Sequence, residues 1–71
     1  MDKFALLKIM SDRNMTQIQL AKEIKVSKNT LNAKLNGKGH FDTKEIDDIC
    51  NALNITDGNL KAHIFLSQSS Q

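Results

Sequence analysis

A run of polar side chains between Ser27 and Lys34 carries the most distinctive chemistry in this 71-residue chain. Hydroxyl, amide and ammonium groups recur along it, while Leu31 and Leu35 fall four residues apart. Amides can bind a base edge through a donor and an acceptor together, and ammonium groups bind guanine edges or phosphates. If the two leucines face inward on a short helix, the polar groups face solvent. The run is therefore a candidate surface for reading DNA.

The polar run must be positioned by the residues before it. Thr16 followed by Gln19 is typical of a capping box, in which each side chain bonds a backbone N–H that the start of a helix leaves without a partner. Apolar residues then recur on one narrow face, at Leu20, Ala21 and Ile24. This pattern predicts a first short helix over about residues 16–24.

A tight turn and a second helix follow. Ser27 is a natural N-cap, and Leu31 and Leu35 share one face of the helix that it would start. An Asn-Gly pair at 36–37 supplies a C-terminal stop. Two short helices joined by a tight turn predict a helix-turn-helix, in which the second helix, here over about residues 27–36, reads the major groove.

The segment resembles the Cro/repressor (XRE-type) helix-turn-helix family of phage and bacterial transcription regulators. The positions that carry the resemblance are Thr16-Gln17, Leu20-Ala21, Ile24, Val26-Ser27, Leu31 and Asn36-Gly37-Lys38. The likeness continues from Phe41 to Thr56. It implies an all-α, compact, five-helix lambda-repressor-like DNA-binding domain. For so small a chain it implies a Cro-like phage protein.

The reading helix departs from the family pattern at two positions. Many relatives have an apolar residue where Lys34 stands, and a glutamate at the Leu35 position that pairs with an arginine on the first helix. The corresponding first-helix residue here is Met10, which predicts an apolar contact in place of the ion pair. Such a replacement can leave stability unchanged, but the tilt of the reading helix cannot be taken from those relatives.

The helix-turn-helix geometry gives each polar residue an expected role. Base edges come within reach of the first turns of the reading helix, so the expected base-reading residues are Lys28, Asn29, Asn32 and Ala33. The expected phosphate contacts are Gln17 at the start of the preceding helix, Ser27, Thr30, Lys34 and Lys38. The alternative for each of them is a solvated surface side chain.

Charge is distributed unevenly along the chain, whose formal net charge is +2. Residues 22–38 contain five lysines and one glutamate, a local balance of +4. Residues 41–59 contain five acidic residues and one lysine, a balance of −4. The basic stretch coincides with the expected reading helix, as attraction to phosphate requires, although charge runs also serve only to solvate a surface.

The remaining sequence predicts three more helices. Residues 2–13 form one, whose inward positions are Leu6, Ile9 and Met10. A second capping box, Asp42 with Glu45, begins the clearest amphipathic helix, whose inward positions are Ile46, Ile49, Cys50 and Leu53. A last helix begins after Thr56 or Asp57. Together these elements predict one domain over residues 1–66, followed by a disordered tail at 67–71.

The end of the predicted domain is more apolar than so small a unit needs. Its apolar residues are Leu60, Ile64, Phe65 and Leu66. They favour a surface for a second copy or for another partner, and relatives of this family often pair through their C-terminal part. The alternatives are that all four close the monomer core, or that residues 64–66 pair as an extended strand.

Catalysis has little support in the sequence. His40 and His63 lack metal ligands at a suitable spacing, so no metal or cofactor is expected. Cys50 falls on an apolar helical face and is expected to be a buried structural thiol. The spacing of a phosphate-binding loop, GxxxxGK followed by Ser or Thr, is absent. The chain is not expected to be an enzyme.

Location follows from similar arguments. No apolar run is long enough to span a membrane, and no signal-peptide pattern opens the chain. A single cysteine cannot form an internal disulfide. These features predict the cytoplasm of a bacterial host.

The sequence thus predicts a sequence-specific regulator of transcription. We expect a Cro-like repressor that occupies a double-stranded DNA operator, as a dimer, and acts by occlusion. The alternative is an antirepressor that modulates repression by binding a partner phage repressor of the helix-turn-helix type. An acidic fourth helix, a reading helix without arginine and an apolar C-terminus keep this alternative open. Salt dependence separates the two, because phosphate contacts make binding steeply dependent on salt.

Overall fold

The computed structural model describes residues 1–66, and that part of the chain folds into five α-helices. They are α1 (Lys3–Asp12), α2 (Gln17–Ile24), α3 (Lys28–Leu35), α4 (Thr43–Leu53) and α5 (Gly58–Phe65). No strand occurs between residues 1 and 66, and the predicted all-α class is confirmed. Residues 67–71, for which the sequence predicts a disordered tail, lie outside the described residues.

Both predicted capping boxes are present. The hydroxyl of Thr16 accepts a hydrogen bond from the backbone N–H of Gln19 at 3.1 Å, and Gln19 Oε1 accepts one from the N–H of Thr16 at 2.9 Å. Asp42 and Glu45 form the same reciprocal pair at the start of α4, at 2.7 and 3.0 Å. Because the capping residue lies outside the helix itself, α2 begins at Gln17 and α4 at Thr43.

Left-handed residues turn the chain at the ends of three helices. Asn14 has φ 56° after α1, Lys25 has φ 62° after α2, and Asn54 has φ 57° after α4. Asparagine tolerates this conformation better than other residues with a side chain, whereas lysine adopts it at a cost in free energy. The turn between α2 and α3 therefore contains a backbone conformation that its residue does not favour.

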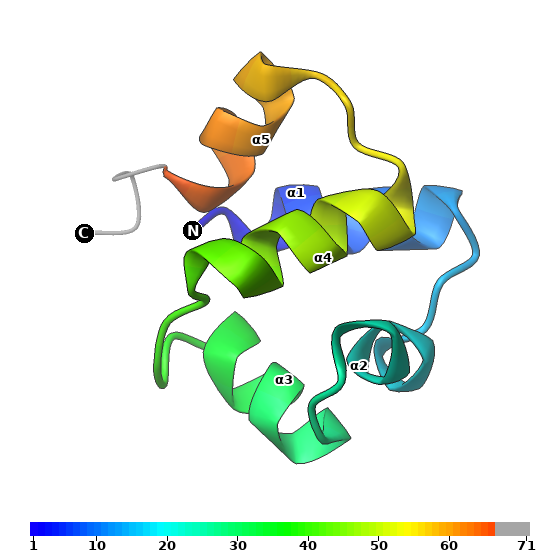
Figure 1. The fold of residues 1–71 in the computed structure, drawn as a ribbon, viewed down its shortest axis with the longest axis vertical. Helices are drawn as coiled ribbons and strands as arrows, with labels where there is room; N and C mark the ends of the chain where they lie inside the picture. The colour runs from blue at the N-terminus through cyan, green and yellow to red at the C-terminus, as the bar shows by residue number, and fades with distance from the viewer. Residues whose placement is uncertain (67–71) are drawn as a thin grey trace.

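The helices enclose one apolar core. α4 runs across the middle of the molecule, with α5 on one side and with α2 and α3 on the other (Figure 1). α2 packs against both α3 and α4, and α1 packs against α5. Every helix contributes to the core, whose buried residues are Leu6, Met10, Leu20, Ala21, Ile24, Leu31, Leu35, Ile49, Cys50, Leu53, Ile55 and Ile64. None of the helices between residues 1 and 66 is long and apolar enough to span a membrane.

The two ends of the domain are joined. The backbone N–H of Asp2 donates to the carbonyl of Ile64 at 2.7 Å. The helical bonding of α5 continues through its last turn, where the N–H of Leu66 donates to the carbonyl of Ala62 at 2.8 Å. The alternative of an extended strand at residues 64–66 is therefore wrong, because the carbonyl and amide groups of this segment are used by the helix and by the N-terminus.

Candidate nucleic-acid interface

α3 buries one face and exposes the other. Leu31 is fully buried and Leu35 is 3% exposed, so these two leucines fix the helix on the core. Lys28, Asn29 and Asn32 are exposed. Ala33 is half-buried on the same helix. All four expected base-reading positions therefore lie on one short helix, three of them with solvent-exposed side chains.

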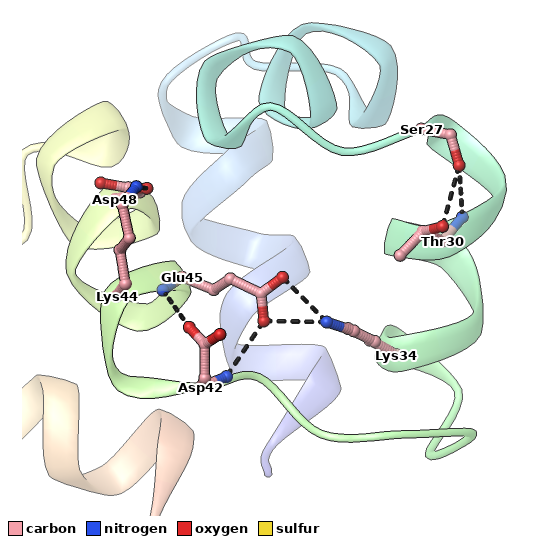
Figure 2. A network of polar contacts seen from close by, with 7 residues as sticks. All are labelled: Ser27, Thr30, Lys34, Asp42, Lys44, Glu45 and Asp48. Atoms are coloured by element: carbon pink, nitrogen blue, oxygen red, sulfur yellow. Dashed lines mark hydrogen bonds and ion pairs between the residues drawn. The ribbon is translucent and has the colours of Figure 1, made fainter.

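The start of α3 is rigid and polar. Ser27 Oγ accepts a hydrogen bond from the N–H of Thr30 at 3.0 Å and also lies 2.9 Å from the hydroxyl of Thr30 (Figure 2). The two hydroxyls thus fix each other at the N-terminus of the helix, where exposed N–H groups and the helix dipole favour an anion. Both side chains are exposed and suited to a phosphate.

Asn32 belongs to a short chain of polar contacts on the last turn of α3. Asn36 Nδ2 donates to the side-chain oxygen of Asn32 at 3.2 Å and to its carbonyl at 3.0 Å. Lys3, from α1, donates to Asn36 Oδ1 at 2.6 Å. Asn36 therefore orients the amide of Asn32, which keeps its own NH₂ group and one oxygen lone pair for a base edge.

Lys34 is placed differently from the expectation. Its ammonium lies 2.8 Å from each carboxylate oxygen of Glu45 on α4, and the side chain is only 21% exposed. The ammonium also lies 5.9 Å from the centre of the Phe41 ring. A cation held in this way is occupied inside the domain, so the structure does not support Lys34 as a phosphate contact.

The other lysines of the basic stretch remain available. Within residues 1–66, Lys22, Lys25, Lys28 and Lys38 form no ion pair. On α4, by contrast, Asp48 pairs with Lys44 at 2.9 Å, and Asp47 pairs with Lys61 of α5 at 2.9 Å. These hydrogen-bonded carboxylates raise the pKa of both lysines. The four available lysines of the basic stretch thus lie on α2, at its C-cap, on α3 and in the loop after α3.

Gln17 lies where α2 begins. It is the first residue of that helix, and its side chain is half-buried. The capping box uses the N–H groups of Thr16 and Gln19. The N–H groups of Gln17 and Ile18 have no acceptor within the helix, as is usual in a first turn. An anion at this position would meet two backbone donors and an amide side chain.

The residues expected at a dimer or partner surface separate into two groups. Ile64 is fully buried and belongs to the monomer core, so its assignment to an interface is wrong. Leu60 and Phe65 are half-buried, whereas Leu66 is 68% exposed. Phe65 packs edge-on against Phe41, with ring centres 6.2 Å apart. Ile64 is the one buried residue of α5, so the other three apolar residues keep part of their surface exposed.

An exposed apolar region adjoins the end of α5. Phe4, on α1, is 77% exposed. It lines a groove of about 580 Å³ together with Phe41, Ile46 and Phe65. A smaller, mostly apolar groove of about 240 Å³ shares Ile46 and Phe65 and reaches Leu66. Sequence reasoning did not single out Phe4, because an isolated aromatic residue has no periodic signal.

Three residues that the sequence places in the core are buried, as expected. Cys50 is 6% exposed, and burial raises the pKa of its thiol, so the thiol stays protonated at neutral pH. Met10 and Leu35, the positions of the expected apolar replacement for an ion pair, are each 3% exposed in the same core.

Three residues that support the surface were not identified from the sequence. Asn36 lies four residues after Asn32, a spacing that could have indicated their contact. Lys3 and Glu45 reach α3 from other helices, and no local pattern gives such contacts.

Comparison with known proteins identifies the family of the domain. No curated protein matches the chain, and no solved structure matches it. A family model described as a Cro/C1-type HTH DNA-binding domain matches residues 5–64, which include all five helices except the ends of α1 and α5. The chain therefore belongs to the Cro/C1-type helix-turn-helix family of DNA-binding domains.

Proposed function

We propose that this chain represses transcription by occupying a double-stranded DNA operator and excluding polymerase or a competing repressor. The observation that carries the proposal is the exposed polar face of α3, which is fixed on the core by Leu31 and Leu35. Asn29 and Asn32 would read adenine edges, and Lys28 would read guanine. DNA as ligand would place the chain in the cytoplasm of a bacterial cell.

Phosphate contacts would set the register of the domain on DNA. Ser27, Thr30 and Gln17 would bind phosphates through their side chains and through the N-termini of α3 and α2. Lys38, exposed in the loop after α3, would add a charge contact. Ala33 would touch a thymine methyl group.

A dimer would double the contacts. Its seam would consist of Leu66 and Phe65 at the end of α5 and Leu60 near its start, with the exposed ring of Phe4 beside Phe65. Two-fold pairing of the domain would place the centres of two half-sites about 34 Å apart, or roughly 10 base pairs.

The test begins by selecting duplexes that the chain binds from a random 20-base-pair library. Binding to a selected duplex is then measured by gel shift at several salt concentrations. Replacing Asn29 and Asn32 with alanine should weaken binding by about 1–3 kcal/mol for each lost bidentate contact, with an unchanged salt slope. Asn51→Ala, an exposed asparagine on the acidic helix α4, is the matched control.

Lys38 gives the complementary result. Lys38→Ala should weaken binding to selected and scrambled duplexes alike, and should reduce the log–log salt slope by about 0.9. Failure of the wild-type chain to enrich any duplex would refute the proposed function.

The apolar region near Phe4 favours a second candidate, an antirepressor that binds a partner phage repressor. Phe4 and Leu66 expose most of their surface. Phe4 lines the larger groove, whose lining is part polar, and Leu66 lines the smaller, mostly apolar one; both grooves reach Phe65 of α5. Mixing the chain with a repressor encoded beside it, and measuring repressor binding to its operator, tests this candidate. Release of the operator that is lost in Phe4→Ser, but not in Asn29→Ala, would favour the antirepressor.

A further inference from the structure

The contact between Lys34 and Glu45 joins the last turn of α3 to the first turn of α4. The ammonium of Lys34 lies 2.8 Å from both carboxylate oxygens, and the two side chains are 21% and 14% exposed. Figure 2 shows the lysine extending from α3 directly toward the glutamate. An ion pair that is shielded from water and doubly hydrogen-bonded is stronger than a pair at the surface.

Both partners are held in place by other contacts. Glu45 Oε1 also accepts the N–H of Asp42 at 3.0 Å, so the capping box of α4 fixes the carboxylate (Figure 2). The stem of Lys34 passes the loop after α3, where a Cβ atom added to Gly39 would lie 3.6 Å from Lys34 Cγ. The ring of Phe41 lies 5.9 Å from the ammonium. Glu45 is therefore held by the capping box, and Lys34 is held by both oxygens of that carboxylate.

α3 is held by apolar packing and by two polar contacts. It packs closely against α2, and Leu31 and Leu35 bury one of its faces in the core. The polar contacts join its C-terminal end to other helices, Lys34 to α4 and Asn36 to α1. Of these two contacts, the one between Lys34 and Glu45 is shielded from water, so it has the larger influence on the angle of α3.

We propose that Glu45 is a positioning residue for DNA recognition. By holding Lys34, it fixes the angle at which α3 presents Asn29 and Asn32 to the major groove. This inference rests on the proposed function of α3 as the reading helix. It adds a determinant of specificity on a helix whose acidic surface would itself be repelled by DNA.

The direction in which Glu45→Gln changes the affinity for DNA separates the positioning role from a purely electrostatic effect of Glu45. Glu45→Gln removes a negative charge, which by electrostatics alone strengthens binding to DNA. It also releases Lys34, which would strengthen binding further if Lys34 were a phosphate contact. The positioning role predicts weaker binding to the selected duplex. Glutamine keeps the capping box, because its side-chain oxygen still accepts the N–H of Asp42.

The first experiment compares affinities for a selected 20-base-pair duplex and for a scrambled one. Glu45→Gln should weaken binding to the selected duplex on the order of three- to thirtyfold, because a changed angle of α3 weakens the base contacts without removing them. Binding to the scrambled duplex should stay the same or tighten. Asp48→Asn is the matched control, because it removes the same charge from α4 at a residue that pairs with the exposed Lys44. Asp48→Asn should not weaken binding to the selected duplex or to the scrambled one.

The partner residue completes a double-mutant cycle. Lys34→Met leaves Glu45 without its cation, and Glu45→Gln leaves Lys34 without its anion. The double variant leaves no charge unpaired, so it should lose less affinity for the selected duplex than the two single losses combined. Equal unfolding midpoints in urea would show that the variants remain folded at the assay temperature.

Amide hydrogen exchange tests, without DNA, whether Glu45 holds the last turn of α3 in place. Glu45→Gln should speed amide exchange at Leu35 and Asn36 by about fivefold or more, and should leave α2 unchanged. Unchanged exchange, or tighter binding of Glu45→Gln to the selected duplex, would overturn the proposal. If the wild-type chain enriches no duplex, the proposed function fails instead, and the exchange result alone decides whether Glu45 holds α3.

Discussion

Ile64 and Leu66 lie two residues apart at the end of α5, yet the structure gives them opposite roles. Ile64 is fully buried, whereas Leu66 is 68% exposed. Ile64→Ala removes three carbon atoms, which is about 2.4 kcal/mol of transfer free energy at ~0.8 kcal/mol per methylene. The cavity left behind brings the expected loss to about 2–5 kcal/mol. Leu66→Ala should change the free energy of unfolding by less than about 0.5 kcal/mol.

This loss would be a large part of the total. At roughly 0.05–0.15 kcal/mol per residue, a domain of this size has only about 4–11 kcal/mol of stability. Urea unfolding followed by circular dichroism measures the difference. With an m-value near 1 kcal/mol/M, the midpoint for Ile64→Ala should fall by about 2 M or more. A midpoint equal to that of wild type would refute the placement of Ile64 in the core.

Because Leu66→Ala should leave stability unchanged, this variant can be used to test self-association. Sedimentation equilibrium should show weaker self-association in Leu66→Ala at unchanged stability, if the end of α5 is the dimer seam. Equal association of the two proteins would move the seam away from Leu66.

Two further predictions concern stability. Burial raises the pKa of the Cys50 thiol, so the unfolded chain loses this proton at a lower pH than the folded one. The buried neutral thiol therefore makes its whole contribution to the free energy of unfolding below about pH 8.5, and this contribution falls as the pH rises above that value. Urea unfolding at pH 7.5 and 9.5 should show a smaller decline in Cys50→Ala, and parallel declines would contradict the assignment. Asp42→Ala should cost about 1 kcal/mol, because its carboxylate caps α4 at 2.7 Å from the N–H of Glu45. Asp57→Ala removes the cap of the shorter helix α5, and its effect on stability can be compared with that of Asp42→Ala. Thermal unfolding midpoints that stay unchanged in both variants would show that the caps do not stabilise the domain.

Much of the fold could be predicted because its signals are local. Two capping boxes indicate where α2 and α4 begin, namely Thr16 with Gln19 and Asp42 with Glu45. Each can be recognised in the sequence because a capping box needs only four consecutive residues. The all-α class followed from these boundaries and from the apolar periodicity between them.

The environment of single side chains was harder to predict. Lys34 has the polarity of a phosphate contact, and only the fold brings Glu45, eleven residues away on another helix, against it. Ile64 and Leu66 are both apolar, and composition alone does not say which one faces the core. Such assignments depend on the relative rotation of helices, which the packing of the whole domain sets.

The roles of the base-reading residues stay predictions. Exposure of Lys28, Asn29 and Asn32 is necessary for contact with DNA, but their partners lie outside the chain. Their base preferences depend on the docking angle of α3, which the sequence does not encode in any one position.

The hydrogen bond between Asp2 and Ile64 has a consequence for the order in which the domain assembles. It joins residues separated by almost the whole domain, so forming it means closing a long loop at a high cost in chain entropy. The helices and their caps, by contrast, need only neighbours in sequence. Docking of α5 on α1 is thus expected late in folding, with a nucleus built from α2, α3 and α4. In such a domain, the unit of α2, α3 and α4 forms before the chain ends meet, and weakening α5 speeds unfolding more than it slows folding.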